Sequence, residues 1–213
     1  ETRPWFTLLD PAAVSGYARS RTALVVGAGL AGCSTAYSLA QRGWQVTLCE
    51  GGAELASGAS GNSQLALRCR LFKQASPVAE YFLHCFLFAH RQFDQLAIST
   101  DLLWRKCGVL QLGSAMKGRH KISDADLDAL YSPAVIAPMS RADAAIAAGM
   151  ALVDSAWYLP NGGWVNPLSL CRAYVSHPNI HLRCSTPITS LRRGRDTWSA
   201  LGADGIPVAG ETS

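Results

Sequence analysis

The sequence predicts an α/β fold in which a parallel-sheet domain is interrupted by a mixed region of strands and short helices. Three features of the 213 residues predict it. A strand, a glycine turn, a helix and a second strand follow one another over residues 22–50. A long apolar helix is expected at residues 77–96. Short strands and turns come after it, and nothing after Glu50 repeats the opening unit.

The opening βαβ stretch is predicted from its hydrophobic pattern. Thr22–Val26 is an apolar run typical of a strand buried in a parallel sheet. Residues 30–42 place apolar side chains at helical spacing, and Gly43 ends the helix. Gln45–Cys49 is predicted to be the second strand.

The turn between the first strand and the helix has the pattern Gly27-x-Gly29-x-x-Gly32, and Glu50 follows about 20 residues later. The first glycine permits the tight turn, the second lets the backbone approach a pyrophosphate, and the third lets the helix pack closely on the sheet. The helix N-terminus offers N–H groups to the phosphates. Glu50 can accept hydrogen bonds from a ribose diol. The competing interpretation is a glycine-rich turn without a ligand, and the surrounding strand, helix and acid favour a Rossmann-like dinucleotide site.

The remaining elements are predicted from the spacing of hydrophobic residues and from capping and turn residues. Residues 77–96 are apolar and aromatic at helical spacing, so we expect a long buried helix whose aromatic side chains lie in the core. Asn166 and Pro167 form an N-cap and first-turn pair, which predicts a helix to about Ser176. Shorter helices are expected at 124–131 and Arg141–Ala148, and strands within 102–112, 157–165, 180–184, 187–191 and Trp198–Leu201.

These elements divide the chain into four segments. Residues 1–20 are interpreted as a linker or leader, and residues 21–98 as the first segment of the nucleotide-binding domain. Residues 99–163 are assigned to part of a substrate domain. Residues 164–213 are expected to return to the nucleotide-binding domain, without completing it.

Composition favours an ordinary globular protein, with 49% hydrophobic and 16% charged residues. No apolar run is long enough to span a bilayer, and the N-terminus lacks a signal pattern, so we expect a cytoplasmic protein without a membrane partner. The chain begins at Glu1 rather than Met, which suggests a piece of a longer protein. Its seven cysteines contain no close pair, which favours reduced thiols over a disulfide framework or a metal site. Cys33 and Cys49 are expected to pack in the core.

The net charge of +4 is compatible with a nucleic-acid partner but does not by itself indicate one. Solvated surface is the default interpretation of the basic clusters, and RNA contact is the alternative. The clusters are Arg68/Arg70/Lys73, Arg105/Lys106, Lys117/Arg119/Lys121 and Arg192/Arg193/Arg195.

The loop after Glu50 is dense in small residues and contains Gly58-Ala59-Ser60-Gly61-Asn62. On these residues the chain resembles the D-amino-acid-oxidase/glycine-oxidase superfamily of FAD-dependent oxidoreductases. Within it, the chain is similar to the oxidoreductase half of a family of bifunctional tRNA-modifying enzymes. The similar stretches are QRGWQVTL at 41–48, GASGN at 58–62, FAHRQFDQL at 88–96, CGVLQLG at 107–113 and LPNGGWVNP at 159–167.

The resemblance implies an FAD-binding domain interrupted by a mixed β/α substrate domain and truncated at its C-terminus. It implies oxidation of the C–N bond of a carboxymethylaminomethyl group on the wobble uridine of tRNA, which leaves the aminomethyl base. A methyltransferase domain upstream would then methylate that amine. The partner implied is tRNA, and the flavin supplies the redox chemistry.

The resemblance also implies which residues hold FAD. The glycine turn would bind the pyrophosphate, Glu50 the adenosine ribose, the loop at 58–62 the phosphates, residues 64–66 the isoalloxazine, and Ile188 the adenine. No catalytic side chain is identified, although Arg68 and Arg70 are available to a substrate carboxylate. The full expected set is Gly27, Ala28, Gly29, Leu30, Ala31, Gly32, Glu50, Gly51, Gly58, Ala59, Ser60, Gly61, Asn62, Gln64, Leu65, Ala66 and Ile188.

Other functions stay open at this point. A small-molecule amine or amino-acid oxidase of the glycine-oxidase type is the alternative enzyme. A non-catalytic remnant is the alternative outside enzymes, because Leu65 replaces a glycine of the family pattern and the chain ends early. A nicotinamide dehydrogenase is disfavoured, since it has no use for the GASGN loop.

Overall fold

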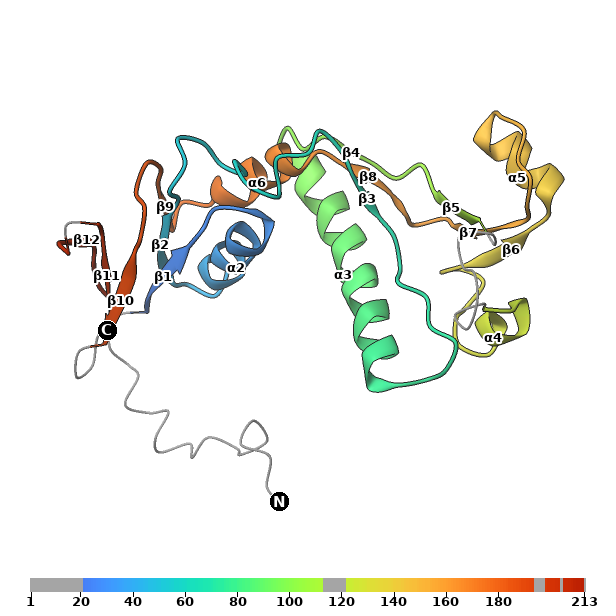
Figure 1. Ribbon diagram of the computed structural model, residues 1–213, viewed down its shortest axis with the longest axis horizontal. Helices are drawn as coiled ribbons and strands as arrows, with labels where there is room; N and C mark the ends of the chain where they lie inside the picture. The colour runs from blue at the N-terminus through green and yellow to red at the C-terminus, as the bar shows by residue number, and fades with distance from the viewer. Residues whose placement is uncertain (1–20, 113–121, 194–197, 204, 213) are drawn as a thin grey trace, which may run out of the picture. The chain divides into compact units, whose positions relative to one another are not determined.

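The computed structural model describes residues 21–112, 122–193, 198–203 and 205–212 (Figure 1). The Lys117/Arg119/Lys121 cluster, Arg195 and the expected leader at 1–20 lie outside these residues. The chain divides into two compact units. Unit 1 comprises residues 1–61 and 171–213, and unit 2 comprises residues 62–170.

Unit 1 is built on a parallel three-stranded sheet with the order β1-β2-β9. Its strands are β1 (Thr22–Val26), β2 (Gln45–Cys49) and β9 (Ile180–Arg183). Helix α2 (Leu30–Ala40) connects β1 to β2 and buries Cys33, Ala36 and Ala40. The predicted opening βαβ unit is therefore confirmed, and both Cys33 and Cys49 are buried as expected.

A second, antiparallel sheet of unit 1 has the order β10-β11-β12. Its strands are β10 (Ser190–Arg193), β11 (Trp198–Leu201) and β12 (Pro207–Thr212). The strand expected at 187–191 thus begins three residues later than predicted, at Ser190. The strand expected at 180–184 is β9, which pairs in parallel with β2 rather than joining the antiparallel sheet.

Unit 2 contains two antiparallel sheets, with the orders β3-β8-β4 and β5-β7-β6. The first is formed by β3 (Leu65–Leu67), β8 (Gly163–Val165) and β4 (Trp104–Arg105). The second is formed by β5 (Val109–Leu112), β7 (Ala156–Leu159) and β6 (Ala137–Met139). The stretch 102–112 was predicted to form a strand or hairpin arm and the stretch 157–165 a β segment that contains a turn, and both divide between the two sheets.

Glycines at the points of division explain this difference. Gly108 has φ +78 and donates its N–H to the Gly162 carbonyl oxygen at 3.0 Å. The two segments therefore lie side by side at the point where each passes from one sheet to the other. A Cβ atom on Gly163 would lie 2.1 Å from the Arg105 carbonyl oxygen, which only glycine avoids.

Helix α3 (Pro77–Ser99) begins as its sequence predicts, because the Ser76 side chain accepts the N–H of Ala79 at 3.1 Å and Pro77 follows the cap. It buries Phe86 and Phe93. The expectation that all of its aromatic residues lie in the core is wrong at Tyr81, which is 64% exposed, and at Phe88, which is 60% exposed.

Three further helices match their predicted positions closely. Helix α4 (Asp124–Asp128) begins with a capping box formed by Ser123 and Asp126, but it ends three residues before the expected limit at Tyr131. Helix α5 (Arg141–Ala148) ends at Gly149 in the left-handed conformation. Helix α6 (Pro167–Val175) is capped by Asn166, whose Oδ1 accepts the N–H of Ser169 at 2.8 Å.

The boundaries of the two units differ from the expected segments. The sequence placed the first change of domain after residue 98 and the return at 164, whereas the structure places them after Gly61 and Leu170. The reason is the packing of α3, which belongs to unit 2. Phe86 lies in the same core cluster as Leu159, and the Phe93 ring is 5.3 Å from the Trp104 ring.

The core of unit 2 gives a stability prediction. Leu159 is fully buried in the cluster, so Leu159→Ala is expected to lower the free energy of unfolding by about 3 kcal/mol through lost apolar burial and the cavity left behind. Chemical denaturation followed by circular dichroism measures the change. Val153→Ala is the control, because Val153 is 83% exposed and its truncation should change stability by less than about 0.5 kcal/mol. Equal losses for the two variants would contradict the assigned core.

Candidate cofactor site

The glycine turn of unit 1 lies between β1 and α2. Gly27 adopts φ +94, a left-handed conformation that favours glycine, and its N–H donates to the Cys49 carbonyl oxygen at 2.7 Å. A Cβ atom on Gly32 would lie 1.8 Å from the Gly27 carbonyl oxygen. The first turn of α2 therefore packs directly on the backbone of the glycine turn, and any side chain at position 32 would separate them.

The N-terminus of α2 is open to a negative group. Its N-cap is Gly29, which offers no side-chain cap, and the first turn contains no acidic residue. The helix dipole and the N–H groups of the first turn are therefore not balanced by a carboxylate on the helix itself. The Ser60 hydroxyl oxygen accepts the N–H of Leu30 at 3.2 Å and lies 3.1 Å from where a Gly29 Cβ would be. A serine of the small-residue loop thus lies at this helix end.

Glu50, at the end of β2, points toward the same turn. Its Oε2 accepts the N–H of Ala28 at 2.7 Å, and its Oε1 accepts the N–H of Gly52 at 2.8 Å. Partial burial acts to raise the pKa of Glu50, but these two N–H groups and the Ser57 hydroxyl together lower it below its ordinary value. The carboxylate is therefore held in its ionised form beside the glycine turn.

The lowered pKa of Glu50 predicts a pH dependence of stability. The folded state binds the proton of Glu50 more weakly than the unfolded state, whose pKa is near 4.5, so ionised Glu50 stabilises the fold above that pH. This contribution is lost as the pH falls through the lower, folded-state pKa. We expect the difference in free energy of unfolding between the parent chain and Glu50→Gln to be constant above about pH 5 and to shrink toward pH 3. Urea denaturation at a series of pH values measures it, and a difference that grows on acidification would contradict the assigned contacts.

The loop at 51–61 folds back onto the glycine turn. The N–H of Ala56 donates to the Ala28 carbonyl oxygen at 3.1 Å, and the N–H of Gly61 donates to the Gly58 carbonyl oxygen at 2.9 Å. A Cβ atom on Gly61 would lie 3.1 Å from the carbonyl oxygens of both Ala56 and Gly58. The small residues of this loop therefore serve a tight backbone path that places Ser60 at the end of α2.

The structure brings most of the predicted residues into one unit. Unit 1 contains the glycine turn, Glu50, the loop and Ile188, which precedes β10. Its predicted residues are Gly27, Ala28, Gly29, Leu30, Ala31, Gly32, Glu50, Gly51, Gly58, Ala59, Ser60, Gly61 and Ile188. The other four lie in unit 2, where Leu65 and Ala66 belong to β3 and Asn62 and Gln64 precede it.

Two contributors are absent from the predicted set. Gly52 supplies an N–H to the Glu50 carboxylate, and the Gly51-Gly52 pair directly after the acid was the available signal. Thr186 donates its N–H to the Glu50 carbonyl oxygen at 2.7 Å, so the segment after β9 holds the end of β2. Nothing local in the sequence indicates the second contact, because the two residues are far apart along the chain.

These features of the site together define a class of protein. A glycine-rich turn, a helix N-terminus whose N-cap residue Gly29 offers no side chain, and an ionised carboxylate after the second strand fit the pyrophosphate and ribose of a dinucleotide. Within the described parts of the chain, no group of three His, Cys, Asp or Glu side chains is placed to hold a metal ion. No helix among them is long and apolar enough to cross a membrane. The β1-α2-β2 part of unit 1 therefore has the form of a dinucleotide-binding βαβ unit.

The comparisons with known proteins identify the family. The FAD dependent oxidoreductase family, DAO, matches residues 22–210, and the chain belongs to this family. The resemblance expected from the glycine turn and the GASGN loop is thereby confirmed. FAD is the cofactor of the family, and the residues of unit 1 fit its ADP portion.

The similar curated proteins are named tRNA 5-methylaminomethyl-2-thiouridine biosynthesis bifunctional protein MnmC. The chain is 38% identical over 201 residues to the one from Pseudomonas putida, and the aligned residues are 94% of this chain and 29% of the relative. It is 38% identical over 173 residues to the one from Hahella chejuensis, which covers 81% of this chain and 28% of the relative. The chain thus spans less than a third of the length of these relatives.

Solved structures share the fold. Glycine oxidase from Geobacillus kaustophilus superposes with a TM-score of 0.64 at 20% identity, over 87% of this chain and 52% of the other. Iminodiacetate oxidase from a Chelativorans species superposes with a TM-score of 0.62 at 22% identity, over 88% of this chain and 53% of the other. The expected α/β fold of an FAD-dependent oxidase is therefore confirmed.

Proposed function

We propose that this chain is part of an enzyme that oxidises the C–N bond of carboxymethylaminomethyluridine at the wobble position of tRNA. The observation that carries the proposal is the 38% identity, over 94% of this chain, to a protein named for tRNA 5-methylaminomethyl-2-thiouridine biosynthesis. Membership in the FAD-dependent oxidoreductase family supplies the type of chemistry.

The proposed reaction balances as a two-electron oxidation followed by hydrolysis. The secondary amine of the base loses two hydrogens across the bond between its nitrogen and the carboxymethyl carbon, giving an imine. The carboxymethyl carbon would lose a hydride and the nitrogen a proton to solvent, and hydride acceptance is the chemistry that FAD would supply when bound to this chain. Water then cleaves the imine, which leaves the aminomethyl base on the tRNA and releases glyoxylate.

The residues of this chain bind and orient the cofactor in this proposal. The N–H groups at the start of α2 and the loop at 58–62 hold the pyrophosphate, while Glu50 accepts hydrogen bonds from the adenosine ribose. Residues 64–66 would hold the isoalloxazine, and the backbone of Ile188 would hold the adenine. Ser60, whose oxygen accepts the N–H of Leu30 at the helix end, would donate its O–H to a phosphate oxygen.

The relatives also suggest the setting of the reaction. The relatives are named as bifunctional proteins, so we propose that a methyltransferase domain upstream uses the aminomethyl product. The proposed partner is tRNA, the proposed compartment is the cytoplasm, and no metal takes part.

The test uses tRNA that carries carboxymethylaminomethyluridine. The chain is incubated with FAD and this tRNA in air, after which glyoxylate is measured and the digested nucleosides are analysed by mass spectrometry. We expect glyoxylate and aminomethyluridine in equal amounts. Unmodified tRNA is the control and should give neither product.

The same experiment separates the proposal from its alternative. Hydrogen peroxide released from free glycine or sarcosine, with modified tRNA left unchanged, would contradict the proposal and favour a small-molecule amine oxidase. FAD that stays bound without oxidising either kind of substrate would favour a non-catalytic protein.

A further inference from the structure

A hollow on unit 2 combines two arginines with aromatic rings. It has a volume of about 640 Å³ and is lined by Leu67, Arg68, Arg70, Phe82, Cys85, Phe86 and Ala89. Its walls come from the end of β3, the segment that follows β3, and the N-terminal half of α3. Its volume is within the range of natural small-ligand sites, which is enough for one nucleotide.

Both arginines carry charge that the protein does not neutralise. Within the described residues, neither the Arg68 nor the Arg70 guanidinium forms an ion pair with a carboxylate. No acidic side chain is among the residues that line the hollow. Lys73 is the third basic residue of this segment, and its charge helps to lower the pKa of Asp126. Its charge is therefore partly balanced within the protein. The hollow therefore favours an anionic ligand.

Arg70 is held in place by aromatic rings. Its guanidinium carbon lies 5.3 Å from the centroid of the Phe72 ring and 5.1 Å from that of the Phe82 ring. Stacking of this kind fixes the planar group and leaves its N–H edges free to bind a phosphate bidentately. A fixed donor of two hydrogen bonds recognises an oxyanion better than a mobile lysine does.

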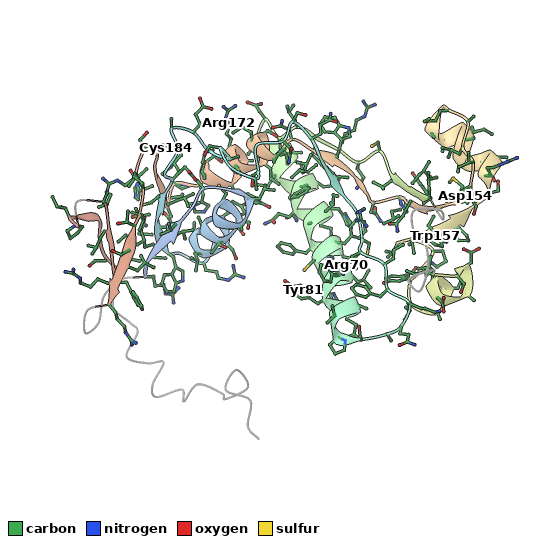
Figure 2. All side chains as sticks on the ribbon, viewed as in Figure 1. Arg70, Tyr81, Asp154, Trp157, Arg172 and Cys184 are labelled. Carbon is green, nitrogen blue, oxygen red and sulfur yellow. The ribbon has the colours of Figure 1, made fainter. Side chains whose placement is uncertain are left out.

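An exposed ring lies at the rim of the hollow. Tyr81 is 64% exposed, and its ring centroid lies 5.7 Å from that of Phe82. Figure 2 shows Arg70 and Tyr81 along the N-terminal half of α3. Tyr81 lies one helical turn before Cys85, which lines the hollow, so the two side chains lie on the same side of α3. Stacking on such a ring is the usual way in which proteins hold an unpaired base.

We propose that Arg68, Arg70 and Tyr81 form a binding site for single-stranded RNA, in which the arginines bind phosphates and Tyr81 stacks on a base. Guanidinium groups without a carboxylate partner beside an exposed ring are typical of surfaces that bind single-stranded nucleic acid. The inference rests on the proposed function in one respect, namely that the RNA is the unpaired loop of a tRNA. A small carboxylate would use the arginines but has no need of the exposed ring.

The test is a binding measurement without turnover. Fluorescence anisotropy of the full chain is followed with a fluorescein-labelled RNA hairpin that has a single-stranded loop, at several salt concentrations. We expect Arg68→Ala/Arg70→Ala to weaken binding at least tenfold. Loss of two phosphate contacts should also reduce the slope of log K against log salt by about 1.4, since each contact to a single strand contributes about 0.7.

Matched variants separate a site from general charge. Arg91→Ala removes one positive charge from the exposed surface of α3, outside the hollow, and should leave the affinity within about twofold. Arg68→Glu reverses one charge of the hollow and leaves Arg70 beside its aromatic rings. Circular dichroism checks that each variant is folded. Tyr81→Ala should weaken binding about tenfold, whereas Tyr81→Phe keeps the ring and should bind like the parent chain.

Several results would overturn the inference. These are an absence of RNA binding by the parent chain, an equal loss in Arg91→Ala, or an unchanged affinity in Arg68→Ala/Arg70→Ala. Binding of free iminodiacetate that requires the two arginines, with RNA binding unaffected, would make the hollow a small-carboxylate site and would also overturn it.

The outcomes also distinguish this inference from the proposed function. RNA binding through Arg68 and Arg70 without glyoxylate formation contradicts the proposed function alone. Glyoxylate formation from modified tRNA with unchanged affinity in the variants contradicts the RNA site alone.

Discussion

Gly32→Ala is expected to lower the free energy of unfolding by about 3 kcal/mol and to weaken FAD binding at least a hundredfold. The reason is steric, because the added Cβ would lie 1.8 Å from the Gly27 carbonyl oxygen, on backbone that cannot move aside. To relieve the overlap, α2 must move away from the turn, and its first N–H groups then no longer converge with the turn on one anion. Chemical denaturation measures the first effect, and quenching of flavin fluorescence measures the second.

Gly58→Ala is the matched control for this prediction. Gly58 lies in the loop at 51–61, where a Cβ would meet nothing within 4 Å, and its φ lies outside the left-handed range. Gly58→Ala should keep the stability of the parent chain to within about 0.5 kcal/mol. If Gly32→Ala were as stable as Gly58→Ala and bound FAD as tightly as the parent chain does, the close packing of α2 on the turn would be wrong.

Glu50→Ala is expected to weaken FAD binding by about a hundredfold, since hydrogen bonds to a charged group contribute about 1.5–3 kcal/mol and the ribose offers two donors. The variant also leaves the N–H groups of Ala28 and Gly52, bound at 2.7 Å and 2.8 Å, without their acceptor. Isothermal titration with ADP and with FAD measures the loss. The two ligands should be affected by similar factors, because the ribose in question belongs to the adenosine that they share.

The control for Glu50 is Glu54→Ala. Glu54 is an exposed acid of the same loop and is not hydrogen-bonded to the glycine turn, so its removal changes the net charge equally without touching the site. Its FAD affinity should stay within about twofold of the parent chain. Equal losses in the two variants would mean that Glu50 acts only through its charge, and a ribose contact would be contradicted.

The first unit could be predicted because its signals are local. Strand β1, the glycine turn, α2 and β2 follow one another directly, and each has its own period or turn residue. The caps at Ser76, Ser140 and Asn166 likewise act on residues three positions away, so the starts of α3, α5 and α6 were predictable.

The sheets of unit 2 could not be predicted in the same way. Whether β4 pairs with β8, and β5 with β7, depends on residues 44 to 61 positions apart, and the propensity of a short strand does not specify its partner. Glycines at 108, 162 and 163 lie where the two segments pass from one sheet to the other. The overlaps that exclude a side chain, with Tyr158 at Gly108 and with Arg105 at Gly163, exist only in the folded protein.

The candidate site shows the same division. The turn, Glu50 and the loop were predicted from one continuous stretch, whereas the contact of Thr186 with Glu50 arises from the parallel pairing of β9 with β2. Tyr81 was assigned to the core from its helical spacing, and it is exposed because the buried face of α3 runs through Phe86 and Phe93. Periodicity locates an apolar stripe but not its exact edges.

The central claim is that FAD lies at the glycine turn of unit 1 with its pyrophosphate at the N-terminus of α2. A crystal structure of the chain with FAD tests it most directly. We expect a pyrophosphate oxygen within hydrogen-bond distance of the first N–H groups of α2, and the Glu50 carboxylate bound to the adenosine ribose. Flavin bound elsewhere, or Glu50 still joined only to Ala28 and Gly52 while the adenosine lies away from it, would contradict the claim.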